Sequence, residues 1–512
     1  MKFHPNWLLP LLIIVGVLSP FAFSPHDVWF LPFVQFFILL FAIEKWPTLS
    51  GFKAGLAFGL GWFASGISWV HISLDQFGGL PLLVTLALML VLSLYLALFF
   101  AGATWLSCRF SPYFFASRVA FFPFSFALFE WLRSWFFTGF PWLSVGYSQL
   151  DSPMQVFAPL IGEYGTSFVL ILLVAVVVLL LCRLQYKQGA IVVLVSLTLI
   201  PLMQLINWQE GVIKHANVTL VQGNIKQENR WMPEKMWPTM NKYRDLSRPY
   251  YNSSDIIIWP EAAVPVIEKH AEDYLVSIDN ALGYQNSALI TGVVDYNFDS
   301  ENYFNSLIVL GKADPNASST QYTYNHPNRY SKHHLLPIGE FVPFQELLRP
   351  IAPLFDLPHS SFKRGDYVQP NIVANGFSIL SAICYEIVFP EQIRANITSE
   401  TDFILTVSND AWFGHSVGPH QHLQIARMRA LEFALPVVRV TNNGLTAIAD
   451  ETGGIVAKAP QFEESVLQYK LPISRSQTPY TVWGNNPIYL FICIAFLYVG
   501  FRYKNHIAKR CG

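Results

Sequence analysis

Long apolar runs fill the first two-fifths of the chain, and a shorter one lies near its end. A run of about 20 apolar residues is long enough to cross a bilayer as a helix. The pattern predicts seven transmembrane helices before residue 207 and an eighth close to the C-terminus. In chain order these predicted spans are Trp7–Phe23, Val28–Ile43, Leu56–Ile72, Leu80–Leu106, Val119–Phe137, Val156–Leu181, Ala190–Ile206 and Pro487–Phe501.

From about residue 208 the pattern changes to short β-branched runs that end in polar clusters. Examples are "ANVTLVQGNI", "SDIIIWPEAAVP", "SALITGVVDY", "FSILSAICYE" and "TDFILTVSND", which read as strands followed by turns. Between such runs, "HQHLQIARMRALEFAL" has apolar residues at helical spacing. Alternating strands and helices indicate a layered α/β domain. We therefore predict a membrane bundle over 1–207, a polar domain over 208–484, and a last helix with a basic tail over 485–512.

Composition and charge support this division. Hydrophobic residues make up 53% of the chain and charged residues only 13%, against about 25% charged residues in soluble domains. Only 14 of the 67 Asp, Glu, Lys and Arg residues precede Asn207. A net charge of −1 gives no support for a nucleic-acid partner, which would require a basic surface.

Lys and Arg in short loops predict the orientation of the spans, because such loops favour the cytoplasmic side. With the N-terminus inside, the loops at 24–27, 73–79 and 138–155 face outward and contain no Lys or Arg. The polar domain then lies outside, which in a bacterium is the periplasmic face of the inner membrane. The inward loops and the tail carry Lys45, Lys53, Arg109, Arg118, Arg183, Lys187, Arg502, Lys504, Lys509 and Arg510.

One cysteine stands alone in the polar domain. Of the five cysteines, only Cys384 belongs to it, although an oxidising compartment favours paired cysteines. A lone thiol of this kind is either a buried apolar filler or a reactive group. The domain contains no dinucleotide, nucleotide, zinc-protease or zinc-ribbon motif.

Three segments of the polar domain place a reactive side chain in a polar stretch. Glu261 follows "IIIWP", Lys332 lies in "RYSKHHLLPIGEFVP", and Cys384 follows "FSILSAI". A cysteine nucleophile needs a base to remove its proton or a cation to stabilise its thiolate. A lysine also stabilises the oxyanion of an acyl-transfer intermediate, with the backbone N–H of Tyr385 as a second donor. Taken singly, each of these residues has an ordinary structural interpretation.

Together the segments resemble the Glu-Lys-Cys sites of the carbon–nitrogen hydrolase (nitrilase) superfamily. The matching motifs are W-P-E, K-x-H-L-x-P-x-G-E-F and I-C-Y-E. With the predicted spans, the resemblance narrows to the membrane-bound branch of that superfamily, the apolipoprotein N-acyltransferases. It extends over nearly the whole chain through "AFSPHDVW", "GFPWLSVGYSQ", "RGDYVQP", "SNDAWFG" and "RMRALE".

This resemblance implies a four-layer α-β-β-α sandwich seated on a membrane bundle of about eight spans. It implies that Glu261 is the base, Cys384 the nucleophile and Lys332 the oxyanion donor. Glu340 is expected to orient Lys332, and Tyr385 and Glu386 match the residues that follow the nucleophile.

The resemblance also implies a reaction in two steps. A fatty acyl chain passes from a phospholipid, typically phosphatidylethanolamine, to the cysteine as a thioester. It then passes to the N-terminal amine of a diacylglyceryl-cysteine on an apolipoprotein. We expect a monomer that uses no cofactor and no metal.

Further residues are expected at the substrate. Trp231, in "RWMPEKMWP", matches a functionally important tryptophan of the family, and Asn409 and Trp412, in "SNDAWFG", are expected to shape the acyl pocket. "RWMPEKMWP" and "LLRPIAPLFDLPHSSF" are interpreted either as lids at the membrane interface or as packing within the domain. The adjacent histidines 333 and 334 favour a structural role over a zinc site, because no third ligand is apparent.

Two other functions remain open from the residues alone. A membrane-tethered amidase would hydrolyse a small amide with the same three residues, and a labelled acyl group on Cys384 would distinguish the acyltransferase from it. A transporter or receptor would use the exported domain only to bind ligand, although the spans lack the paired broken segments typical of carriers.

Overall fold

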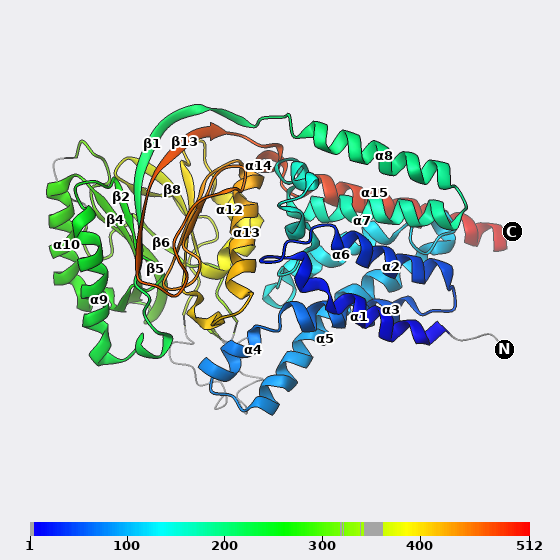
Figure 1. Ribbon diagram of the computed structural model, residues 1–512, viewed down its shortest axis with the longest axis horizontal. Helices are drawn as coiled ribbons and strands as arrows, with labels where there is room; N and C mark the ends of the chain where they lie inside the picture. The colour runs from blue at the N-terminus through cyan, green and yellow to red at the C-terminus, as the bar shows by residue number, and fades with distance from the viewer. Residues whose placement is uncertain (1–4, 318–319, 321, 338, 342–361, 512) are drawn as a thin grey trace. The chain divides into compact units, whose positions relative to one another are not determined.

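The computed structural model describes residues 5–317, 320, 322–337, 339–341 and 362–511. These residues form two compact units (Figure 1). The first comprises Met1–His71, Pro81–Asn207 and Thr478–Gly512, and the second comprises Ile72–Leu80 and Trp208–Gln477. The second unit thus includes a short segment from the apolar N-terminal part of the chain.

The first unit is helical, and a helix overlaps each of the eight predicted apolar segments. The helices outside the polar domain are α1 (Leu8–Val17), α2 (Leu31–Lys45), α3 (Gly51–Gly66), α4 (Val70–Ile72), α5 (Leu82–Phe110), α6 (Phe122–Trp135), α7 (Ala158–Cys182), α8 (Tyr186–Met203), α14 (Pro479–Trp483) and α15 (Asn486–Cys511).

Within the described residues, four helices are long and apolar enough to cross a membrane, or five if the bent pair Gly51–Gly66 and Val70–Phe77 counts as one span. These helices identify a membrane protein, and the count of eight spans stays a prediction. One boundary differs clearly, since α1 ends at Val17 and not at Phe23. Pro20 follows in a 3₁₀ turn, and proline cannot continue the hydrogen-bond ladder of an α-helix.

A buried ion pair holds part of this unit together. Arg133 Nη2 lies 2.7 Å from Glu130 Oε2 on α6, and Arg133 Nη1 donates to the carbonyl of Trp142 at 2.8 Å. Both charged side chains are almost completely buried. The two residues, spaced three apart, therefore pair on one face of α6.

The second unit contains two sheets among its described residues. The larger sheet has the order β13-β1-β2-β4-β5-β6, with β3 paired to β4, and the smaller has the order β12-β11-β10-β9-β8-β7. The strands are β1 (Gln209–Gln222), β2 (Ile256–Ile258), β3 (Val264–Ile267), β4 (Ala288–Asn297), β5 (Asn302–Gly311), β6 (Arg329–Ser331), β7 (Ile372–Ala374), β8 (Phe377–Ile383), β9 (Phe403–Ser408), β10 (Val437–Thr441), β11 (Ala447–Ala449), β12 (Ile455–Lys458) and β13 (Ser465–Ser476).

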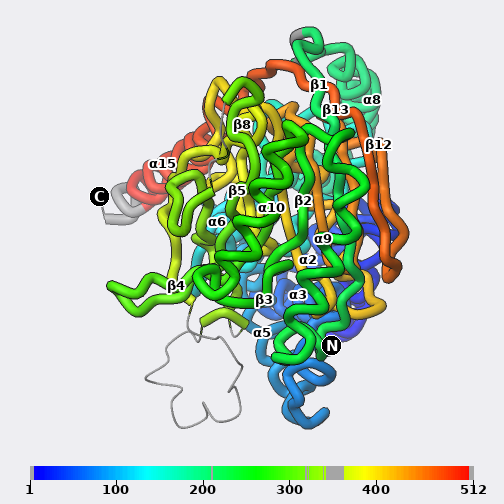
Figure 2. Tube along the Cα trace, turned by 90° about the vertical axis from the view of Figure 1, so that its left-hand side faces the viewer, coloured from blue at the N-terminus to red at the C-terminus, as the bar shows by residue number. Residues whose placement is uncertain are grey.

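The principal helices of this unit are α9 (Pro233–Ser247), α10 (Glu272–Gln285), α12 (Pro390–Asn396) and α13 (Gly418–Phe433). The last of these confirms the helix predicted over "HQHLQIARMRALEFAL". Figure 2 shows α9 and α10 on the outer face of the larger sheet, and Figure 1 shows α12 and α13 beside the smaller one.

Side chains from both sheets form one core. Fully buried residues of the larger sheet pack against those of the smaller, including Leu220, Ile258, Ile290, Ile379, Leu405 and Val440. A second core joins α9 and α10 to the outer face of the larger sheet, through residues such as Met240 and Leu275. Burial of each such side chain contributes about 1.5–3 kcal/mol. The two sheets therefore lie face to face.

Parallel pairing brings polar strand ends to common edges. β2 runs parallel to β1 and β4, and β9 runs parallel to β8 and β10. Since parallel strands end at the same edge of a sheet, the residues that follow β8 and β9 lie near each other. Those residues are Cys384 and Asn409.

The two proposed lid segments have different outcomes. "RWMPEKMWP" enters α9, whose first residue is Pro233, a favoured position for proline. Its Met232 and Trp237 side chains are 39% and 51% exposed, so they project from the domain surface, and the lid itself stays a prediction. Almost all of "LLRPIAPLFDLPHSSF" lies outside the described residues.

Candidate active site

The turn that carries Glu261 is pressed against β4. It follows β2 after Trp259 and Pro260, and Trp259 is completely buried with its indole N–H donating to Ser247 Oγ at 2.6 Å. A Cβ on Gly292 of β4 would collide with the backbone nitrogen of Ala262. Only glycine at 292 therefore allows the turn to approach this closely.

Lys332 follows β6 and is buried between two carboxylates. Its Nζ lies 2.8 Å from Glu340 Oε2 and 3.7 Å from Glu261 Oε1, and its side chain is 1% exposed. Burial alone would lower the pKa of Lys332, but Glu340 and Glu261 raise it above its ordinary value. The lysine is therefore a fixed cation at neutral pH.

Asn305 of β5 fixes both carboxylates. Its Nδ2 donates to Glu261 Oε1 at 2.8 Å and to Glu340 Oε1 at 3.0 Å. Its backbone carbonyl accepts from the backbone N–H of Lys332 at 2.8 Å. Sequence reasoning missed this residue. The available signal was a polar amide at the head of the otherwise apolar run "NSLIVLG".

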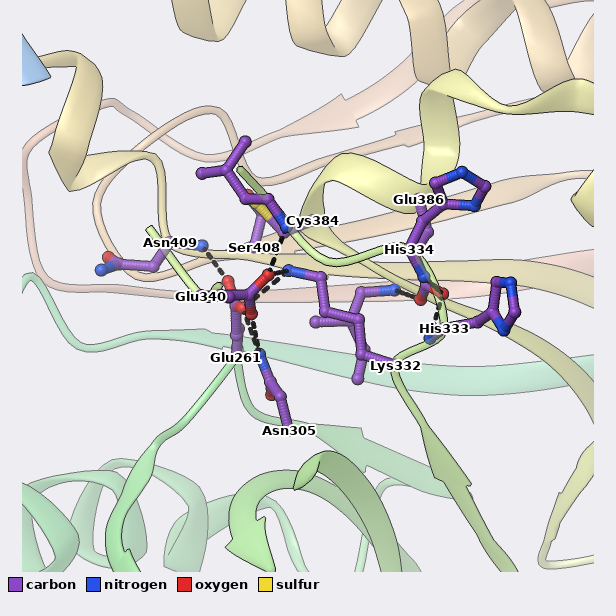
Figure 3. A network of polar contacts seen from close by, with 12 residues as sticks. Glu261, Asn305, Lys332, His333, His334, Glu340, Cys384, Glu386, Ser408 and Asn409 are labelled. Carbon is purple, nitrogen blue, oxygen red and sulfur yellow. Dashed lines mark hydrogen bonds and ion pairs between the residues drawn. The ribbon is translucent and has the colours of Figure 1, made fainter. Parts of the chain in front are cut away.

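Cys384 lies at the sharp turn between β8 and the 3₁₀ helix η12 (Cys384–Val388). Its φ of 54° is left-handed, a conformation that costs a non-glycine residue about 1–3 kcal/mol and clusters at functional sites. Figure 3 shows the cysteine beside Ser408 and the Glu261–Lys332–Glu340 cluster.

Its environment keeps the thiol protonated. Burial, and after it the charge of Glu261, raise the pKa of Cys384 to about 12, although Lys332 opposes the rise. A neutral thiol at pH 7 is a poor nucleophile. To act as a nucleophile, Cys384 would need a base within reach, and Glu261 is the ionisable group with the largest effect on its pKa.

Glu386 ties the cysteine turn to the lysine segment. Its Oε2 accepts from the backbone N–H of Ile383 at 2.8 Å, and its Oε1 accepts from those of His333 and His334 at 2.8 and 3.1 Å. The Tyr330 hydroxyl and the Gln392 amide also donate to Oε1. Burial raises the pKa of Glu386, while these donors oppose the shift. Its position is therefore that of a structural anchor.

The two histidines after Lys332 form hydrogen bonds with neighbouring residues of the same domain. His333 Nδ1 lies 2.7 Å from the Gly365 carbonyl, and His334 Nδ1 lies 2.9 Å from Gln392 Oε1. Burial lowers the pKa of His334 to about 4. His334 is therefore neutral at pH 7.

The residues expected at the substrate lie around Glu261. Asn409 donates its backbone N–H to Glu261 Oε2 at 3.0 Å. Trp231 stacks beneath Arg230, whose Nη2 donates to the Glu261 carbonyl at 2.5 Å. Arg230 was not predicted, although it precedes Trp231 in the sequence.

Trp412 lies further out, in the 3₁₀ helix η13 (Asp410–Phe413). Its carbonyl accepts from Ser73 Oγ at 2.7 Å, and its ring lies 5.8 Å from that of Phe77. Ser73 and Phe77 are the first and last residues of η3 (Ser73–Phe77), which lies in the segment Ile72–Leu80 of the second unit. Tyr385 is buried and packs edge-on against Phe389.

A carboxylate, a buried ammonium and a thiol on a strained turn suit covalent acyl transfer. Comparison with known proteins agrees with this chemistry. Residues 15–176 match the apolipoprotein N-acyltransferase N-terminal domain, and residues 217–478 match the carbon–nitrogen hydrolase family. The apolipoprotein N-acyltransferase of Vibrio cholerae is 44% identical over 483 residues, which cover 94% of each chain. The chain belongs to the apolipoprotein N-acyltransferase family.

A second relative and one solved structure are also similar to this chain. The apolipoprotein N-acyltransferase of Shewanella oneidensis is 44% identical over 505 residues, covering 96% of this chain and 95% of that one. Among solved structures, XC1258 from Xanthomonas campestris, a carbon–nitrogen hydrolase superfamily protein, is 18% identical with a TM-score of 0.36, covering 51% of this chain and 91% of that one.

Proposed function

We propose that this acyltransferase moves a fatty acyl chain from a phospholipid, phosphatidylethanolamine in the main case, to the N-terminal amine of diacylglyceryl-cysteine on apolipoproteins. The chain travels as a thioester on Cys384. One observation carries the proposal: Glu261 and the buried ammonium of Lys332 converge on a thiol held in a left-handed turn. Family membership supports the acyl acceptor and favours this function over a small-molecule amidase or a transporter.

In the first step, Glu261 takes the proton of Cys384 and the sulfur attacks the ester carbonyl of the phospholipid. The C–S bond forms, and Lys332 with the Tyr385 N–H stabilises the oxyanion. The C–O bond then breaks, and Glu261 returns its proton to the leaving oxygen. A thioester and a lysophospholipid result.

In the second step, the neutral α-amine of the acceptor attacks the thioester. The C–N bond forms, the C–S bond breaks, and a proton of the amine passes through Glu261 to the sulfur. The free enzyme is restored. A thioester accepts amines more readily than an oxygen ester does, so two moderate barriers replace one high barrier.

The neighbouring residues keep this arrangement in place. Glu340 accepts from Lys332 and orients its ammonium, while Asn305 and Asn409 hold the two oxygens of Glu261. We assign Trp231 and Trp412 to the lipid route, on the basis of their positions next to Arg230 and in the loop that begins at Asn409.

We also propose the setting of this reaction. The catalytic domain spans 208–484, folds as a four-layer α-β-β-α sandwich, and lies on the periplasmic side of a bacterial inner membrane with eight spans. The chain acts as a monomer. The face-to-face sheets with outer helices and the distribution of Lys and Arg support this proposal.

The test is mass spectrometry of the purified protein after incubation with acyl-labelled phosphatidylethanolamine. We expect one fatty acyl adduct on Cys384, which hydroxylamine removes and an apolipoprotein acceptor consumes. The Cys384→Ala protein forms no adduct, whereas Cys493→Ala, altered in α15, forms it normally. Turnover to free fatty acid without an adduct would contradict the thioester pathway.

A further inference from the structure

A buried polar network lies behind Cys384, and the proposed reaction does not use it. Its members are Asp410 of η13, His422 of α13 and Arg439 of β10, and none of the three is more than 1% exposed. They come from three different elements. Burying two charged groups and an imidazole is costly unless they are paired, so their arrangement calls for a specific explanation.

His422 connects this network to the backbone of the cysteine. Its Nε2 lies 3.1 Å from the carbonyl oxygen of Cys384. Its Nδ1 lies 3.0 Å from Arg439 Nη2 and 3.2 Å from Asp410 Oδ1. Arg439 Nη2 is also 2.7 Å from Asp410 Oδ2.

These contacts determine which nitrogen of the imidazole carries the hydrogen. A carbonyl oxygen only accepts, so Nε2 must be protonated to bond with it. Nδ1 lies between Arg439, which only donates, and Asp410 Oδ1, which only accepts. The Arg439 contact is the shorter, and Asp410 Oδ1 already accepts from the Ser408 hydroxyl at 2.6 Å, so Nδ1 offers its lone pair to Arg439. Burial lowers the pKa of His422, and the charge of Arg439 lowers it further, although Asp410 opposes them. The ring is thus a neutral Nε2–H tautomer.

The Cys384 carbonyl has a direct connection with catalysis. It belongs to the same peptide group as the N–H of Tyr385, and that group is planar, with the two bonds pointing in opposite directions. Whatever fixes the carbonyl of Cys384 therefore also aims the Tyr385 N–H, the second oxyanion donor of the proposed mechanism. The left-handed φ of Cys384 makes this peptide unfavourable without such support.

We propose that His422 is a positioning residue. Its Nε2–H donates a hydrogen bond to the Cys384 carbonyl and thereby orients the Tyr385 N–H toward the oxyanion, while Arg439 and Asp410 determine the tautomer of the imidazole. This inference rests on the proposed function, since it assigns a role relative to the acyl-transfer intermediate.

Two substitutions of His422 distinguish the contribution of its Nε2 from that of its Nδ1. The amide nitrogen of His422→Gln reaches the place of Nε2, whereas that of His422→Asn reaches only the place of Nδ1. We expect His422→Asn to slow single-turnover acylation of Cys384 by phosphatidylethanolamine about 10- to 100-fold, below the effect of removing an oxyanion donor outright, with KM unchanged. His422→Gln retains a rate within about threefold of the wild type, because the hydrogen bond survives.

A second readout tests positioning against general disruption. Alkylation of Cys384 by iodoacetamide forms no oxyanion, so its rate stays within about threefold in both variants. Equal acylation by His422→Asn and the wild type would overturn the proposal, as would a parallel fall in alkylation.

If His422→Asn does not fold, Arg439→Lys replaces it: the lysine keeps the charge beside Asp410 but lacks the planar group that faces Nδ1. Acylation then falls while alkylation holds, and unchanged acylation would refute the inference.

The Cys384→Ala protein distinguishes failure of the positioning role of His422 from failure of the proposed function. If Cys384→Ala still transfers acyl chains, the proposed function fails whatever the His422 variants do. If Cys384→Ala is inactive and His422→Asn is fully active, only the positioning role fails.

Discussion

At the scale of residues, Glu261 and Cys384 change each other's chemistry. The charge of Glu261 is, after burial, the main cause that raises the pKa of the thiol to about 12. Glu261→Gln removes that charge, so the pKa of Cys384 falls and the pH profile of iodoacetamide alkylation moves to lower pH. At pH 8–9 alkylation therefore becomes faster, because a larger fraction of the sulfur is thiolate.

Acyl transfer by Glu261→Gln changes in the opposite direction. The base is lost, and we expect the rate to fall by about 10²–10⁴, the usual contribution of general base catalysis. Glu463→Gln, at an exposed carboxylate of the same unit, leaves both rates unchanged. If Glu261→Gln slowed alkylation and transfer together, Glu261 would be supporting the fold of the site and not serving as its base.

Single residues also show where sequence reasoning stops. Glu261, Lys332 and Cys384 could be predicted together because each ends or follows a distinctive motif, and the structure places them in one cluster. Asn305 and His422 could not, because an asparagine in a strand and a histidine in a helix are ordinary until their neighbours are known. Their roles depend on pairing between distant segments, so a local feature such as the polar amide that opens "NSLIVLG" does not specify which groups it contacts.

At the scale of elements, the position of Glu261, the proposed base, depends on how closely a turn approaches β4. Gly292→Ala places a methyl group against the backbone at Ala262, so the turn that carries Glu261 must move. We expect destabilisation of about 1–3 kcal/mol, typical of overpacking, and at least a tenfold loss of acylation. Thermal unfolding and the Cys384 adduct assay measure these effects. Gly211→Ala, where an added Cβ meets no atom within 4 Å, is the control.

Glu386 joins two elements, the end of β8 and the segment after β6. Glu386→Gln replaces an accepting oxygen by an NH₂ group that faces backbone N–H donors. Such a mismatch leaves buried donors unsatisfied and costs about 1–3 kcal/mol, measured by denaturant unfolding. Glu391→Gln breaks a half-exposed pair with Arg394 and is expected to cost less than about 1 kcal/mol. Equal stability of the two variants would show that Glu386 is not an anchor.

The boundaries of helices and strands were predictable only where the sequence contains a clear signal, such as a regular apolar spacing. The apolar spacing of "HQHLQIARMRALEFAL" predicted α13, whereas the start of α9 at Pro233 was not predicted. The first apolar run contains Pro20, which ends α1 at Val17, yet hydropathy alone extended it to Phe23. Hydropathy measures lipid preference and does not register the loss of a single backbone donor.

At the scale of the whole molecule, the charge pattern predicts which side of the membrane the catalytic domain faces. We expect a membrane-impermeant maleimide to label Ser300→Cys, an exposed site after β4, in intact spheroplasts. Lys504→Cys, in the exposed part of α15, becomes labelled only after permeabilisation, because basic segments favour the cytoplasm. Both substitutions are made in a chain whose own five cysteines are replaced.

The same experiment bears on the chemistry, because the proposed substrates meet only on one side. A thioester at the outer leaflet can be consumed by an exported apolipoprotein, whereas one at the inner leaflet would meet no such acceptor. If Lys504→Cys were labelled in intact spheroplasts and Ser300→Cys were not, the orientation would be the opposite of the predicted one. The catalytic domain would then lie on the side without the apolipoprotein acceptor. Since the two sites report opposite faces of one bilayer, labelling of both in intact spheroplasts reveals leakage and requires a new preparation.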